Sequence, residues 1–243
     1  MTAAAVTAAA LAFVRPRVSL VAAPAHVQLV GAGAETVQVA NRGSARVVVD
    51  ITRAGFALDL RGRPRVIPAP PRRWVRFTPR RLVIAPGGTA SLTVAARVPR
   101  GASPGDHTAL LLVTTRPVPG AGLAVRMRLG VVVVVRVPGR IIHRVVLTAV
   151  RVHRRGHGRV LTIALANRGN VTELLPAGRL TVTLWRRGRR VARLVAPARE
   201  LLPRTRGIAE LRYPGPVRGL VVARAELALE RAHVLRRSFR LRL

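Results

Sequence analysis

The residue types that most often carry out chemistry in proteins are scarce in this 243-residue chain. Cysteine is absent, which excludes disulfides, thiol catalysis and cysteine-ligated metal sites. The carboxylate side chains are Glu35, Asp50, Asp59, Asp106, Glu173, Glu200, Glu210, Glu226 and Glu230. No two of them form a spaced pair in a recognisable catalytic motif, and the chain has no Walker or H-E-x-x-H sequence. General acid–base catalysis needs an acid positioned near its base, so we expect neither an enzyme nor a bound cofactor.

Histidine offers the only other candidate for metal chemistry. His143, His153 and His157 fall within one expected hairpin, and the last two flank a short Arg-Arg-Gly turn. They could approach one metal ion across that turn, but two histidines without a third ligand make a weak site. The neighbouring arginines would also repel a cation. We therefore predict a solvated turn and no metal site.

The charge of the chain is strongly one-sided. It has 43 basic residues, all of them arginine, against 9 acidic ones, for a net charge of +34. A GC-rich bacterial genome explains the absence of lysine but not the shortage of acids. Such a field attracts polyanions, including anionic wall polymers, lipid head groups and nucleic acids. Nucleic-acid binding would also need exposed aromatic rings, whereas Trp74, Phe77 and Trp185 occupy strand positions that favour core packing, so no specific nucleic-acid partner is expected.

The stretch of residues 61–73 is rich in Arg and Pro and is expected to be an extended surface loop. Arginines at the end of this loop and shortly after it would project into solvent. There we predict contacts with an anionic cell-wall polymer, and a peripheral contact with an anionic membrane surface. These predicted polyanion contacts are Arg72, Arg73, Arg80 and Arg81.

A repeated phrase indicates the domain organisation. Residues 37–43 and 161–169 both end an apolar run in Ala-Asn-Arg-Gly, with Asn41 and Asn167 separated by about the length of a small β-sandwich domain. Asn followed closely by Gly is typical of turns, because both residues tolerate a positive φ. Each copy is therefore expected to form an early hairpin-like turn in one of two tandem β-domains.

Short alternating apolar runs separated by turn signals extend over most of the chain. We expect strands near residues 25–30, 35–40, 45–52, 74–78, 89–98, 107–114 and 123–137, and near 141–152, 159–166, 179–185, 189–195, 207–212, 220–229 and 233–243. The sequence thus predicts an all-β protein of two tandem immunoglobulin-like antiparallel β-sandwiches. The first would span residues 18–138 and the second residues 139–243, with few contacts across the Pro138-Gly139 linker.

Four connected segments carry a family resemblance: residues 74–79, 82–88, 91–98 and 104–107. Together they resemble the immunoglobulin-like domains of bacterial envelope proteins, both the PapD-like group with its pilus-assembly chaperones and the DUF916-type Fn3-like surface domains. The resemblance covers residues 18–138 and implies the sandwich fold. Where such domains often carry a Tyr that makes a local hydrogen bond, this chain has His107, which we expect to play a similar structural part. Pilus chaperones grip the C-terminus of the pilus protein that they bind with a basic pair, which has no assignable counterpart here.

Residues 1–17 form a small, Ala-rich apolar stretch that could be the remnant of a secretory signal peptide, or a frayed N-terminus. No segment is long and apolar enough for a transmembrane helix. We therefore predict an exported, non-enzymatic binding or structural module, secreted or on the cell surface of a bacterium. Its partner would be an anionic wall polymer or an envelope protein.

The alternative is a periplasmic-type assembly chaperone that acts by β-strand pairing. The unbroken valine run at residues 131–135 separates the two hypotheses. A central, buried strand favours the surface module. An exposed edge, pairing with a partner strand through Val131, Val133 and Val135, favours the chaperone.

Overall fold

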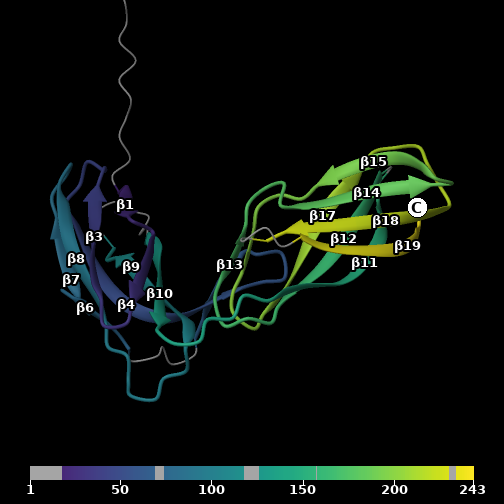
Figure 1. The fold of residues 1–243 in the computed structure, drawn as a ribbon. Coiled ribbons are helices and arrows are strands. Elements are labelled where there is room, and N and C mark those ends of the chain that lie inside the picture. The colour runs from purple at the N-terminus through teal and green to yellow at the C-terminus, as the bar shows by residue number, and fades with distance from the viewer. Residues whose placement is uncertain (1–17, 69–73, 118–125, 157, 230–233) are drawn as a thin grey trace, which may run out of the picture.

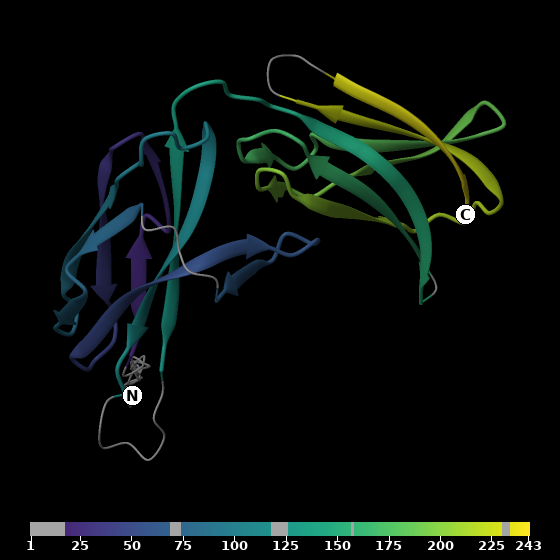
Figure 2. The same ribbon diagram turned by 90° about the horizontal axis from the view of Figure 1, so that it is seen from below.

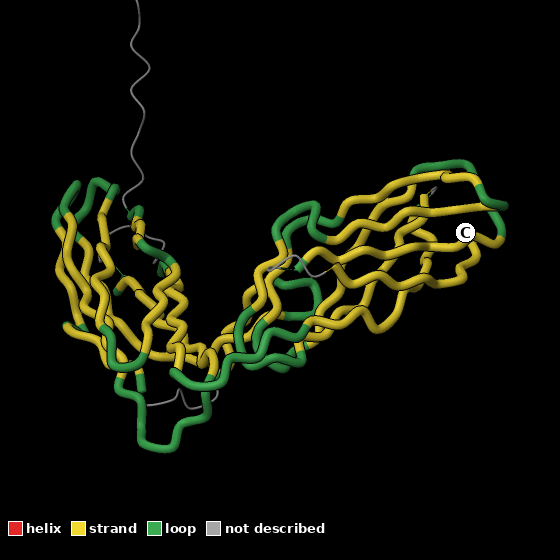
Figure 3. Tube along the Cα trace, viewed as in Figure 1, coloured by secondary structure: helices red, strands yellow, loops and turns green. Residues whose placement is uncertain are grey.

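The computed structural model describes residues 18–68, 74–117, 126–156, 158–229 and 234–243. Two β-sandwiches lie at an angle to each other and meet at one end (Figure 1). The described residues form strands and loops without any helix (Figure 3), and none of their elements is a helix that could cross a membrane. The all-β prediction is confirmed. The leader at residues 1–17, together with Arg72 and Arg73, lies outside the described residues.

The first sandwich packs two sheets face to face. One sheet has the order β1-β3-β8-β6, and the other has β2-β10-β9-β4-β5 with β7 also paired to β4. The strands are β1 (Leu20–Ala23), β2 (His26–Val30), β3 (Ala34–Asn41), β4 (Val47–Leu58), β5 (Pro64–Ile67), β6 (Val75–Thr78), β7 (Arg81–Ile84), β8 (Thr89–Ala96), β9 (Gly105–Thr115) and β10 (Arg128–Val137).

The second sandwich opposes the sheet β11-β12-β17 to the sheet β15-β14-β18-β19, with a small β13-β16 pair beside them. Its strands are β11 (Val145–Arg155), β12 (Gly158–Asn167), β13 (Glu173–Leu175), β14 (Leu180–Arg186), β15 (Arg189–Val195), β16 (Arg199–Leu201), β17 (Arg206–Tyr213), β18 (Leu220–Ala228) and β19 (Val234–Arg242).

Each sandwich has its own core, built from alternate residues of its strands. In β3, Val37 and Val39 are fully buried while Thr36 and Gln38 face solvent, as expected for a strand with one face against a core. The first core draws on residues 20–135 and the second on residues 145–243. The cores do not overlap in sequence, although the boundary at residues 138 and 139 stays a prediction.

The expected surface loop at residues 61–73 differs from the structure. Strand β4 continues to Leu58, and β5 folds back on its end with Gly55 opposite Ile67, so that part of the predicted loop is a hairpin. This hairpin reaches toward the second sandwich (Figure 2, blue). Its turn makes contact there, since the main-chain N–H of Ile208 donates to the carbonyl of Leu60 at 2.7 Å.

The prediction that few contacts cross the linker is wrong. Leu202 of the second sandwich is buried in a cluster with first-sandwich residues that include Phe56, Leu110 and Leu112. Arg61 and Glu210 form an ion pair of 3.0 Å across the same boundary. These contacts arise because β4 is longer than its apolar pattern suggests and carries its hairpin past the edge of its own sandwich.

Candidate functional site

The two copies of the repeated phrase form the same buried motif. Asn41 donates from its side chain to the carbonyls of Ala45, Ile84 and Ala85, and accepts from the Gly43 N–H. The expected hairpin turn is wrong, because the strands on either side of this motif, β3 and β4, belong to opposite sheets. The motif instead carries the chain across the sandwich.

Asn167 repeats this arrangement in the second sandwich. Its side chain donates to the carbonyls of Val171 and Leu201 and accepts from the Gly169 N–H. Strand β12 pairs with β11 and β17, and β13 pairs with β16, so here too the chain changes sheets. Both asparagines are thus structural residues that close equivalent corners of the two domains.

Strand β10, which contains the valine run, is central along one part of its length and an edge along another. Its residues 132–136 lie between β9 on one side and the parallel β2 on the other. Among the residues that the structure describes, its residues 128–131 pair with β9 alone, because β2 begins only at His26, opposite Val132. The strand therefore fits both of the alternatives that the sequence left open.

The side chains of Val131, Val133 and Val135 point into the first core, where each is at most 1% exposed. In the structure they already fill the protein's own interior, so they are not free to enter a partner. Of the three predicted pairing residues, only Val131 lies in the part of β10 that has a free side. The segment open to a partner is thus shifted toward the start of the strand.

The main-chain N–H and C=O groups of residues 128–131 face alternately toward β9 and toward the free side. Val132 donates its N–H to Ala25, away from β9, whereas the carbonyl of Met127 accepts from Thr115 on the β9 side. Main-chain groups alternate between the two sides of an antiparallel strand. Arg128 and Gly130 therefore direct their N–H and C=O groups to the side that β2 leaves free. Both residues are exposed, and Leu129 between them is partly buried.

Of the four predicted polyanion contacts, the structure describes Arg80 and Arg81, and the polyanion site stays a prediction. Arg81 lies at the start of β7 and binds Asp50 at 2.9 Å, and Arg116 binds the same carboxylate at 2.6 Å. The hydrogen bonds from Arg116 and then Arg81 lower the pKa of Asp50 below its ordinary value of 3.8. Arg80 is exposed, and its carbonyl accepts from Ile51. Arg81 is therefore part of an ion-pair cluster rather than a free cation.

The structural part predicted for His107 is confirmed. Its Nε2–H donates to the Ser103 carbonyl at 2.8 Å, and its ring packs edge-on against Trp74 with centroids 4.6 Å apart. The preceding loop, residues 101–105, has the sequence Gly-Ala-Ser-Pro-Gly, which matches the nucleophile-elbow pattern G-x-S-x-G. Ser103, however, precedes strand β9 and opens no helix, so the strand-to-helix geometry of an elbow is missing.

The histidines of the second domain also have structural neighbours. His143 lies 3.0 Å from a carboxylate oxygen of Glu173, and His157 lies outside the described residues. Within the described ranges, no group of three or more His, Cys, Asp or Glu side chains could hold a metal ion.

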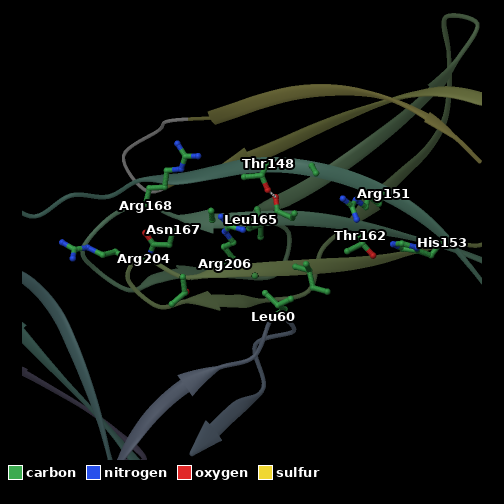
Figure 4. A pocket seen from close by; sticks show the side chains of 16 residues that line it. Leu60, Thr148, Arg151, His153, Thr162, Leu165, Asn167, Arg168, Arg204 and Arg206 are labelled. Carbon is green, nitrogen blue, oxygen red and sulfur yellow. Dashed lines mark hydrogen bonds between the residues drawn. The ribbon is translucent and has the colours of Figure 1, made fainter. Parts of the chain in front are cut away.

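A groove that the sequence analysis missed lies on the outer face of the β11-β12-β17 sheet (Figure 4). Its volume is about 820 Å³, and Leu60 from the β4–β5 turn forms part of its wall. Arg168, Arg204 and Arg206 gather at one end, and Arg151 lies near the other end with His153. In the sequence, the small outward-facing residues of β12 are the one indication of a groove at this position. The arginines come from separate segments that only the fold brings together.

Comparison with known proteins places the fold but gives no sequence relative. No family model and no curated protein matches the chain. Among solved structures, a chain of the chaperone–tip adhesin complex of CFA/I fimbriae biogenesis is similar with a TM-score of 0.53 and 11% identity, over 90% of this chain and 98% of that one.

Two further chaperones show the same likeness. The class 5 fimbriae chaperone CfaA is similar with a TM-score of 0.52 and 12% identity, over 90% of this chain and 98% of its own. The YadV chaperone gives a TM-score of 0.51 and 9% identity, over 91% and 99% respectively. None of the three is described as an enzyme. The chain therefore has the two-sandwich fold of these solved structures along nearly its whole length.

Proposed function

We propose that this protein is an assembly chaperone for a subunit of the bacterial envelope, and that it binds the subunit by β-strand pairing at the start of β10. The observation that carries the proposal is the free side of residues 128–131. An exposed strand edge with unpaired main-chain groups is a template for another strand. The similar structures support this role, since they are chaperones of fimbrial biogenesis.

The direction of the free groups makes pairing specific to one side. A partner strand laid beside Arg128 and Gly130 would extend the sheet at the position that β2 vacates. Gly130 has no side chain to obstruct the approach, and Leu129 between them stays close to the first core. Such pairing would satisfy main-chain groups without displacing the buried valines.

Envelope proteins are assembled outside the cytoplasm, so the proposal includes an extracytoplasmic location and export. The surface-module hypothesis with an anionic wall polymer has less support. Two of its four arginines lie outside the described residues, Arg81 is engaged by Asp50, and the similar structures concern protein partners.

The test begins with a photo-crosslinking amino acid in place of Arg128, in full-length protein produced in its native host. The crosslinked protein is identified by mass spectrometry, purified, and titrated with the unmodified chain. Gly130→Pro then removes the outward N–H and should weaken the affinity for that partner at least about tenfold, as expected when a strand-pairing hydrogen bond is lost and a ring blocks the edge.

Gly130→Ala is the matched control. A Cβ at this position lies 3.2 Å from Leu110 Cδ1, so alanine reproduces that contact while it retains the N–H and lacks the ring that would block the edge. The proposal expects strong binding by the alanine variant and weak binding by the proline variant, with equal circular dichroism for both. Equal affinity of the two variants for the crosslinked partner would overturn it.

A further inference from the structure

The groove on the second sandwich holds cations that have no partner within the described part of the protein. The side chains of Arg151, Arg168, Arg204 and Arg206 make no hydrogen bond or ion pair with any described residue. No Asp or Glu is among the described residues that line the groove, and Glu210 on this face lies opposite Thr162 in the strand register. Glu210 is already paired with Arg61, so the groove presents uncompensated positive charge.

The floor of the groove explains why it is hollow. Thr148, Ala149, Thr162 and Ala164 cover the middle of the sheet with small side chains, and Gly207 contributes none. The Thr148 hydroxyl donates to the Ala164 carbonyl and so adds no free polar group to the floor. The larger side chains stand at the ends and along the wall, which leaves a trough between them (Figure 4).

The spacing of the charges indicates an elongated ligand. The arginines at one end lie beside Asn167, and Arg151 pairs in register with Thr162, which is on the same strand as Asn167. That separation along β12 corresponds to roughly 17 Å at the rise of a β-strand. A single small anion cannot reach both ends, whereas about five to six extended residues of a polypeptide can.

The lining also distinguishes between classes of polymer. No Trp, Tyr or Phe is among the described residues that line the groove, and the imidazole of His153 at one end is the one aromatic ring among them, so a row of sugars or bases would find little surface on which to stack. An apolar contact is present instead, because Leu60 is 56% exposed at the wall and Ile208 lies next to it. Charge at both ends with an apolar patch between them suits a peptide with acidic and apolar side chains.

We propose that this groove binds an extended acidic segment of a partner protein, with carboxylates at both ends of the segment and an apolar side chain against Leu60. The chain itself is a poor source of such a segment, since it has only 9 acidic residues, no two of them adjacent. This site is separate from the edge of β10, and its test does not require strand pairing.

The probe is a capped, fluorescently labelled hexapeptide of five glutamates with one central leucine. It is titrated against the full-length protein in about 0.1 M salt, where the Debye length is about 10 Å. The variant Arg151→Gln/Arg168→Gln/Arg206→Gln should bind it roughly tenfold more weakly, as three lost charge pairs of moderate strength predict.

Because a protein of net charge +34 attracts any anion, the matched control removes the same number of charges elsewhere. Arg186→Gln/Arg189→Gln/Arg190→Gln lies on the exposed β14–β15 turn and should leave the affinity within about twofold. Equal weakening by the two triple variants would overturn the proposal, since it would make the binding a property of net charge.

Two further measurements complete the test. Leu60→Ser should also weaken binding of the peptide, and unchanged affinity would contradict the apolar contact. Inorganic polyphosphate serves as the competing polymer. If polyphosphate binding depends on the groove arginines while peptide binding does not, the occupant is a phosphate polymer and the proposal is wrong. The proline variant at Gly130 should bind the hexapeptide normally, which separates this site from the strand-pairing edge.

Discussion

The paired asparagines offer the sharpest test of the fold, because one substitution can be compared in two domains of the same chain. Asn41 and Asn167 are 0% and 1% exposed, and each hydrogen-bonds main-chain groups on both sides of a sheet crossing. Replacing Asn167 with Ala leaves the carbonyls of Val171 and Leu201 and the N–H of Gly169 without that partner. The same change at Asn41 releases the carbonyls of Ala45, Ile84 and Ala85 and the N–H of Gly43.

The expected cost follows from the number of groups released. Each buried hydrogen bond contributes about 1 kcal/mol, and a buried group left unpaired costs roughly 1 to 3 kcal/mol. Three released groups at Asn167 therefore predict a loss of at least about 3 kcal/mol in the free energy of unfolding. That is a large share of the roughly 5 to 15 kcal/mol typical of a domain. Asn→Asp should be at least as damaging, because a carboxylate oxygen would then face the carbonyls that the amide now binds.

Tryptophan fluorescence can assign each loss to its domain, since Trp74 lies in the first sandwich and Trp185 in the second. In a Trp74→Phe background, urea unfolding is followed by Trp185 of the second sandwich. In a Trp185→Phe background, it is followed by Trp74 of the first. Asn167→Ala should lower the midpoint reported by Trp185 more than that reported by Trp74, and Asn41→Ala should do the reverse. Gln38→Ala, at an exposed position of β3, is the control and should change the free energy by under about 0.5 kcal/mol. Losses below about 1 kcal/mol for both asparagines would refute the reasoning.

Three further outcomes can be measured with the same unfolding assay. Leu202→Ala removes a side chain that is 5% exposed between the two sandwiches, so it should cost about 3 kcal/mol and separate the Trp74 and Trp185 transitions. Asp106→Asn weakens the pair between the buried Asp106 and the partly exposed Arg136 at 2.7 Å and should cost about 2 kcal/mol, whereas an unchanged midpoint would contradict the link. The pKa of Asp50 is lowered in the folded state by Arg116 and Arg81, so its stabilising contribution is present above its ordinary pKa of 3.8 and is lost as the pH falls below that value. Asp50→Asn should therefore flatten the acid side of the stability profile, measured by urea midpoints from about pH 5 to about pH 2, and an unchanged slope would assign the acid sensitivity to other carboxylates.

Local pattern was sufficient to predict the architecture. The alternation in strands such as β3 and β8 predicted buried and exposed faces, and the repeated Ala-Asn-Arg-Gly phrase located equivalent points in two domains. The role of that phrase could not be read locally, because Asn near Gly favours a tight turn whether the next strand joins the same sheet or the opposite one. Only the pairing of β3 with β8 and of β4 with β9 decides between them.

The two candidate binding regions could not be predicted from the sequence for a similar reason. The valine run of β10 indicates burial, but its free side depends on where β2 begins, in a segment far earlier in the chain. The groove depends on similarly distant partners, since Leu60 comes from the first sandwich and Arg151 and Arg206 come from separate strands of the second. With 43 arginines in the chain, no local pattern marks the four that the fold leaves unpaired around one hollow in its described part.

The link between the sandwiches bears on how the two proposed sites would act together. Asp106 at the start of β9 accepts from Arg136 near the end of β10 and from the Thr172 N–H of the second sandwich. The hydrogen bond between Arg136 and Asp106 raises the pKa of Arg136 above its ordinary value. The strand with the free edge is thus tied at its opposite end to the domain with the groove. If this link and the buried Leu202 keep the two sandwiches in the arrangement that the structure shows, a partner that engages both sites would meet them already positioned. Its second contact would then be intramolecular, and weak binding at each site could combine into a strong overall affinity.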